Sequence, residues 1–196
     1  TSHLRTADGL GKVTVENHVV TLRQLLRWGE KAEMVPHGLS EKVIIPDVSA
    51  DERARDDMIS HERAEAIKDY LAEFHYASLK HVIFSLTYHT GARRSAIHGL
   101  DIEDWHPEEQ YISLRHRPDE GTRLKLGTDG ERNVSITDNR LVTTLEDYIS
   151  HQRDDVTDDY GRNPLFTSPQ GRLHYQTLTK KIYTVTRPCF YADECT

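Results

Sequence analysis

Thr90-Gly91-Ala92-Arg93-Arg94-Ser95-Ala96-Ile97 and, two residues later, Leu100-Asp101-Ile102-Glu103-Asp104 are the most informative stretches of this 196-residue sequence. Gly91 allows a sharp backbone turn between two predicted helices. Arg93 is then expected in the first turn of the second helix, where unpaired backbone N–H groups favour an anion. A guanidinium at this place suits a phosphate, although an arginine at a helix start is more often a surface or ion-pair residue.

Lys125 is the second candidate. Residues 122–126 alternate in polarity, which predicts a strand with Lys125 on the face opposite Leu124 and Leu126. The segment 127–130, Gly-Thr-Asp-Gly, has the residues of a hairpin turn. Residues 110–136 hold five basic and four acidic side chains, a net charge of +1 in a chain of −7. This pattern favours a locally basic surface, and a solvated strand face explains the lysine equally well.

Apolar periodicity predicts a mainly α-helical protein with a small antiparallel β-sheet, an α+β class. The expected helices span 13–34, 61–73, 77–89, 93–99, 138–152 and 175–186, and the expected strands span 110–115, 122–126 and 132–136. Thr14 and Ser60 are the expected N-caps of the first two helices. Trp28 and Trp105 are expected to pack in cores.

The sequence divides into three regions. Residues 1–35 carry one amphipathic helix that cannot bury its own apolar stripe, so they are interpreted as the end of a helical domain. Residues 36–57 contain Pro36, Gly38, Pro46 and a run of charges, which predicts a linker. Residues 58–196 form the second domain. The alternative for 36–57 is a long surface loop within one domain.

Composition narrows the classes of function. Hydrophobic residues make up 36% and charged residues 29%, which suits a soluble globular protein, and two cysteines favour a reducing cytoplasm. No apolar run is long enough to span a membrane. The charge of −7 argues against coating nucleic acid by bulk electrostatics. Acids are plentiful and only 8 of 25 basic residues are lysine, so we hypothesise an origin in high salt.

Taken together, the order and spacing of these motifs resemble the catalytic domain of the tyrosine recombinases, the phage integrase family, and within it the integrases of halophilic archaea. The region 1–35 looks like the end of that family's helical core-binding domain. The resemblance implies a tyrosine-recombinase catalytic-domain fold. It also implies cleavage and rejoining of DNA through a 3′-phosphotyrosyl link, for DNA integration and recombination, with no metal or other cofactor.

The resemblance also assigns roles to residues. Arg93 matches the first of two arginines that neutralise the scissile phosphate, and Lys125 matches the general acid that protonates the departing 5′-oxygen. Ala96 stands where the family often has an acid. None of the twelve histidines has an arginine three positions later, so the family's His-x-x-Arg box and the tyrosine nucleophile behind it have no match. We therefore expect a catalytic domain that is incomplete at its C-terminus, binds DNA without recombining it, and is monomeric.

Double-stranded DNA is the expected partner, with a full-length recombinase as a further one. The expected backbone contacts are made by basic residues on the first helix, the sheet and the last helix: Arg23, Arg27, Lys31, Arg115, Arg123, Arg132, Lys180 and Lys181. Cys189 and Cys195 are either half of a zinc site or two ordinary thiols. Two other functions stay open: a non-catalytic regulator or remnant that occupies recombination sites, and a helical interaction module without a DNA role.

Overall fold

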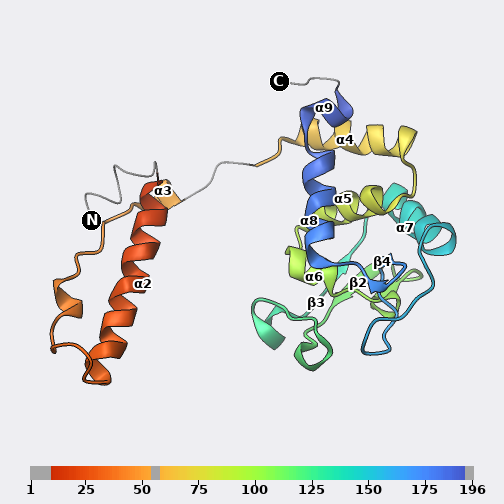
Figure 1. Cartoon of the computed structure of the whole chain (residues 1–196). Coiled ribbons are helices and arrows are strands. Elements are labelled where there is room, and N and C mark those ends of the chain that lie inside the picture. The colour runs from red at the N-terminus through yellow and green to blue at the C-terminus, as the bar shows by residue number, and fades with distance from the viewer. Residues whose placement is uncertain (1–9, 54–57, 193–196) are drawn as a thin grey trace. The chain divides into compact units, whose positions relative to one another are not determined.

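A computed structural model describes residues 10–53 and 58–192. The chain divides into two compact units, Thr1–Met58 and Ile59–Thr196. Figure 1 shows both units, and each is described by itself below. Among the described residues, no helix has both the length and the apolar character that a membrane crossing requires.

The first unit is built on one long helix, α2, at Lys12–Lys31. Its N-cap is Gly11, whose carbonyl accepts hydrogen bonds from the N–H groups of Thr14 and Val15. The prediction that Thr14 is the N-cap is therefore wrong, because Thr14 already lies within the first helical turn. Val15 and Val19 are buried. Trp28 is 58% exposed within the described part of the chain, so the prediction that it packs in a core is also wrong.

Residues 36–53 fold back along α2. They contain a 3-10 helix, η1 at Ser40–Lys42, and a short helix, α3 at Ala50–Arg53. Ser40 is buried and donates from its backbone N–H and its hydroxyl to the carboxylate of Glu30, at 2.6 and 3.1 Å. Arg53 pairs with Glu16 at 2.6 Å. These polar contacts attach residues 40–53 to α2 within the first unit. The role of residues 36–57 as a linker stays a prediction.

The second unit is mainly helical. Its longer helices are α4 (His61–Phe74), α5 (Leu79–Thr90), α7 (Asn139–His151) and α8 (Tyr175–Val185), with short helices α6 (Arg94–His98) and α9 (Pro188–Tyr191). Short 3-10 helices are η2 (Ile102–Asp104), η3 (Pro118–Glu120) and η4 (Gly127–Gly130). The predicted N-cap Ser60 is confirmed, since its hydroxyl accepts from Arg63 N–H.

The main sheet has three antiparallel strands in the order β1-β2-β3, at Trp105–His106, Tyr111–Leu114 and Arg132–Ser135. A second, two-stranded ribbon pairs β4 (Thr167–Ser168) with β5 (Gly171–Arg172). The predicted strand at 122–126 is wrong: only Thr122 forms a bridge, with Arg117, and residues 127–130 form η4 rather than a hairpin turn. β3 pairs with β2 instead, with Ile112 opposite Val134.

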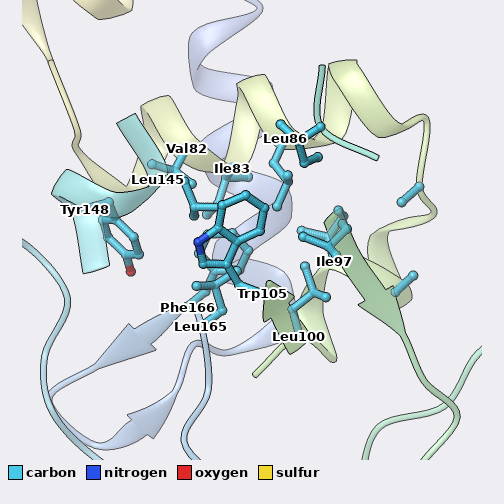
Figure 2. Close-up of a cluster of buried hydrophobic side chains, with 14 of the residues drawn as sticks. Val82, Ile83, Leu86, Ile97, Leu100, Trp105, Leu145, Tyr148, Leu165 and Phe166 are labelled. Atoms are coloured by element: carbon cyan, nitrogen blue, oxygen red, sulfur yellow. The ribbon is translucent and has the colours of Figure 1, made fainter. Parts of the chain in front are cut away.

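The core of the second unit lies between the sheet and the helices. Figure 2 shows Trp105 at its centre, below Val82, Ile83 and Leu86 of α5 and beside Leu145 of α7. Trp105 is 7% exposed, so its predicted place in a core is confirmed. A second apolar cluster joins α4, α5 and the end of α8; its buried members are Ala64, Ile67, Leu71, Phe84 and Val185. α5 therefore packs on two sides, and it fixes the turn that follows it.

Candidate nucleic-acid interface

The turn between α5 and α6 places Arg93. Gly91 ends α5 in the left-handed conformation, with φ of 58°, and its N–H donates to the carbonyl of Thr87. Arg93 is then the N-cap of α6, with extended backbone, rather than a residue of its first turn as predicted. Its carbonyl accepts from the N–H groups of Ala96 and Ile97 at 2.8 and 3.1 Å. The backbone of Arg93 is thus fixed while its side chain is exposed to solvent.

Lys125 lies on an irregular segment, and both backbone groups of the preceding residue, Leu124, form hydrogen bonds. Leu124 is buried in the core, and its N–H donates to Nδ1 of His116 at 3.0 Å. The carbonyl of Leu124 accepts from Gly127 N–H at 3.1 Å. Lys125 itself is exposed and lies outside any strand.

Arg93 and Lys125 line the same small surface depression, although 32 positions separate them. The other lining residues are Ser95, Ala96, Leu124, Leu126, Gly130 and Arg132. Three cations therefore face one depression that no acid lines. Arg132 donates to the carbonyl of Gly130, whereas Arg93 and Lys125 form no side-chain hydrogen bond or ion pair with any residue in 10–53 or 58–192.

A buried ion cluster, which we call the Asp101 brace, lies beside this depression. It consists of Asp101, Asp104, Asp158, Arg117, Arg162 and Arg172. Asp101 is 3% exposed and pairs with Arg162 through one oxygen and with Arg172 through the other, at 2.6 Å for Arg172. Asp101 and Asp104 are the two aspartates of the Leu100–Asp104 motif, and the structure shows that both form internal ion pairs.

Two further pairs of the brace, Arg117–Asp104 and Arg172–Asp158, are short. Arg117 donates to both oxygens of Asp104, at 2.9 and 2.7 Å, and this hydrogen bonding raises the pKa of Arg117. Arg172 also donates to Asp158 at 2.7 Å. Burial disfavours ionised Asp158, but the bonds from Arg172 and from backbone N–H groups outweigh burial, so the pKa of Asp158 lies below its ordinary value.

The brace connects the two halves of the depression. Arg162 donates to the carbonyl of Gly99, just after α6, and to the hydroxyl of Thr122, just before the Lys125 segment, at 3.2 and 2.9 Å. A Cβ atom at Gly99 would lie 3.2 Å from the Cβ atom of Thr122, so these two segments touch at a glycine. Asp101 and Arg162 therefore hold α6 against the segment that carries Lys125.

Two of the three other basic residues predicted on the sheet do not line the depression. Arg115 donates to Asn133 and Ser113 at 3.1 and 3.3 Å, on the polar face of β2 and β3, and does not line the depression. Arg123 is exposed next to Thr122 and does not line it either. Of Arg115, Arg123 and Arg132, Arg132 alone lines the depression with Arg93 and Lys125.

Of the basic residues predicted to contact DNA, those on α2 belong to the first unit, and those on α8 do not line the depression. Arg27 and Lys31 are exposed on α2, and Nε of Arg23 is buried without a hydrogen-bond partner among the described residues. Lys180 is exposed and Lys181 half-buried on α8. Their roles stay predictions.

The structure describes one of the two cysteines that were considered as half of a zinc site. Cys189 lies on α9 as an exposed free thiol, and Cys195 falls outside the described residues. In the described ranges, no three His, Cys, Asp or Glu side chains gather in a way that would hold a metal ion.

Sequence reasoning missed Arg162, Arg172 and His116. Arg162 and Arg172 are joined to Asp101 across 61 and 71 positions of sequence, so no local pattern announces them. The sequence offers one signal, the two aspartates of the Leu100–Asp104 motif. The structure shows that both are buried, and buried carboxylates require cationic or hydrogen-bonding partners.

The fold of this chain is similar to that of two solved structures, a recombinase and a transposon integrase. The crystal structure of XerA recombinase matches with a TM-score of 0.52 at 17% sequence identity, over 94% of this chain and 57% of that one. The structure of the Tn1549 transposon integrase in complex with transposon right end DNA matches with a TM-score of 0.60 at 16% identity, over 91% and 61%. The chain thus spans about three fifths of each neighbour's length.

Comparison with protein-family models and with curated proteins gave no match. The structural likeness carries the assignment of fold, and it agrees with the mainly helical class and small antiparallel sheet expected from the sequence. This chain has the fold of the tyrosine-recombinase catalytic domain.

Proposed function

We propose that this chain is a DNA-binding part of a tyrosine site-specific recombinase or integrase. The observation that supports the proposal best is the acid-free depression lined by Arg93, Lys125 and Arg132. Arg93 and Lys125 are exposed and have no side-chain hydrogen bond or ion pair among the described residues, so they are available to a phosphate. Together with Arg132 they form a local positive charge that favours an anion in a chain of net charge −7. The solved integrase neighbour was in complex with DNA, which adds to this support.

In this proposal Arg93 binds the phosphate that the recombination reaction attacks, and Lys125 lies where a proton can be given to the departing 5′-oxygen. Arg132 adds a third positive charge. Cleavage and rejoining by the whole recombinase, its assembly on DNA and its haloarchaeal type belong to the same proposal. A protein that unfolds on transfer into molar salt would contradict the haloarchaeal part.

The test is a fluorescence-anisotropy titration of the full chain with duplex DNA at several salt concentrations. Arg93→Ala should weaken DNA binding about tenfold. The negative slope of the logarithm of the association constant against the logarithm of salt concentration should become shallower by about one. Lys125→Ala should act in the same direction. Arg140→Ala is the matched control, because Arg140 is exposed and does not line the depression.

Unchanged affinity and slope in Arg93→Ala would contradict the proposal. An absence of salt-dependent DNA binding in the unaltered chain would instead support an interaction module without a DNA role. Because most phosphate contacts position DNA without reading its sequence, the loss should be similar for unrelated duplexes.

A further inference from the structure

Arg94 directly follows Arg93 and does not line the depression, yet two contacts with α8 orient its side chain. Its Nη1 donates to Oγ1 of Thr179 at 2.7 Å. Its guanidinium lies over the ring of Tyr175, with Cζ 3.9 Å from the ring centroid. Tyr175 and Thr179 are one helical turn apart, so both contacts are made to one face of α8. Figure 1 shows α6, which begins at Arg94, beside α8.

These contacts orient the guanidinium of Arg94 without neutralising it. Arg94 is exposed, and among the described residues no carboxylate forms an ion pair with it. An arginine has five N–H donors in a planar fork, and Thr179 accepts from one nitrogen of that fork. By contrast, the arginines of the Asp101 brace are each paired with an aspartate. The contacts with α8 therefore leave the charge of Arg94 and most of its donors available to an anion.

The two helices that Arg94 joins carry no acids. Neither α6 nor the stretch 171–192, which contains α8, has an Asp or Glu, in a chain with 32 acidic residues. Lys180 follows Thr179 on α8 and is exposed. Positive charge is therefore not offset within these segments, and such a surface attracts an anion even in a chain of net charge −7.

We propose that Arg94 binds a DNA phosphate next to the one assigned to Arg93, an inference that rests on the proposed function. Consecutive Cα atoms are about 3.8 Å apart, and each strand of duplex DNA carries one phosphate per about 3.4 Å of helix axis. The two guanidinium groups can therefore reach neighbouring phosphates of one strand. Stacking on a tyrosine ring and a hydrogen bond to a neutral hydroxyl preorganise the fork of Arg94 for this contact.

The test is the anisotropy titration of the full chain with duplex DNA at several salt concentrations. Arg94→Met keeps an unbranched apolar chain over the Tyr175 ring and removes the charge. It should weaken DNA binding about fivefold. The negative slope of the logarithm of the association constant against the logarithm of salt concentration should become shallower by about one. Arg140→Met should change neither quantity and is the matched control, because Arg140 is exposed on α7 and pairs with Asp69.

Two further variants separate a phosphate contact from a purely structural contact between α6 and α8. Arg94→Gln removes the charge and keeps a donor for Thr179, so its slope should match that of Arg94→Met. Thr179→Val removes the acceptor and leaves the charge, so it should weaken DNA binding about twofold and keep the slope. In the Arg94→Met background, Thr179→Val should have no further effect on DNA binding.

Each outcome decides for or against the contact. A loss of affinity with an unchanged slope in both Arg94→Met and Arg94→Gln would show that Arg94 only joins the two helices, and it would overturn the inference. Unchanged affinity in both variants, while Arg93→Ala weakens binding, would also overturn it and leave the proposed function standing. An unaltered chain without salt-dependent DNA binding would contradict the proposed function itself, and this inference with it.

Discussion

The Asp101 brace and the Arg93–Lys125 depression contain similar side chains in opposite states. In the brace, Arg117, Arg162 and Arg172 are largely buried and each is paired with a carboxylate. In the depression, Arg93 and Lys125 are exposed and have no ion partner among the described residues. Paired cations hold the protein together, whereas exposed cations on a braced surface are free to meet an anion.

Removing the central acid tests the brace most strongly. Asp101→Asn should lower the free energy of unfolding by about 3–5 kcal/mol, because Arg162 and Arg172 would remain buried with an incomplete set of partners. Urea unfolding followed by circular dichroism measures this loss. Asp119→Asn, at an exposed position, should change it little. A loss below about 1 kcal/mol in Asp101→Asn would show that the brace is not what stabilises this region.

His81 provides a third case, a buried titratable group whose Nδ1 has no hydrogen-bond partner among the described residues. Its pKa of about 4 in the folded chain lies below the ordinary 6.5, so between these pH values the unfolded chain takes up protons that the folded chain does not. The free energy of unfolding should therefore fall as pH drops from 6.5 to 4, by up to about 3 kcal/mol for this group.

Urea unfolding at a series of pH values measures this dependence. His81→Leu should flatten it, while His18→Gln, on the exposed side of α2, should not. Burial and Arg172 also lower the pKa of His98, which should account for part of the remaining slope. An NMR titration that places the His81 pKa near 6.5 would contradict the prediction.

Gly91 supports the depression through the backbone alone. Its φ of 58° is unfavourable for other residues, and a Cβ atom there would meet no atom within 4 Å. Gly91→Ala should therefore lower the free energy of unfolding by about 1–2 kcal/mol through conformation only. Gly91→Asn should lower it less, because asparagine tolerates the left-handed region. Equal losses in the two variants, measured by urea unfolding, would contradict this explanation.

The sequence predicted α4, α5 and α7 from their apolar stripes, and it also predicted α6 and α8, but it missed the four-residue helix α9. It failed at 122–126 because a five-residue alternation does not reveal that Leu124 N–H bonds to the His116 side chain rather than to a neighbouring strand. Strands β1, β4 and β5 have two residues each, too few to show any period. Trp28 was expected in a core because tryptophan is large and mostly apolar, yet residue type alone cannot tell which side chains find a packing partner.

The site was predicted unevenly for a related reason. Arg93 and Lys125 were found through their resemblance to a family's ordered motifs, and the structure places both at one depression. The brace was not found, because its ion pairs join positions 61 and 71 residues apart and depend on the tertiary fold. Local sequence patterns identify the longer helices, whereas long-range pairing of charges requires the structure.

The smallest effect on stability, and the sharpest form of the comparison, is expected at the depression itself. Arg93→Ala and Lys125→Ala should each change the free energy of unfolding by no more than about 0.5 kcal/mol, because neither side chain is buried or has an ion partner in the described ranges. Arg162→Ala should be clearly destabilising in the same urea experiment. If Arg93→Ala proved as destabilising as Arg162→Ala, Arg93 would have an internal structural role, and its availability to a DNA phosphate would lose its physical basis.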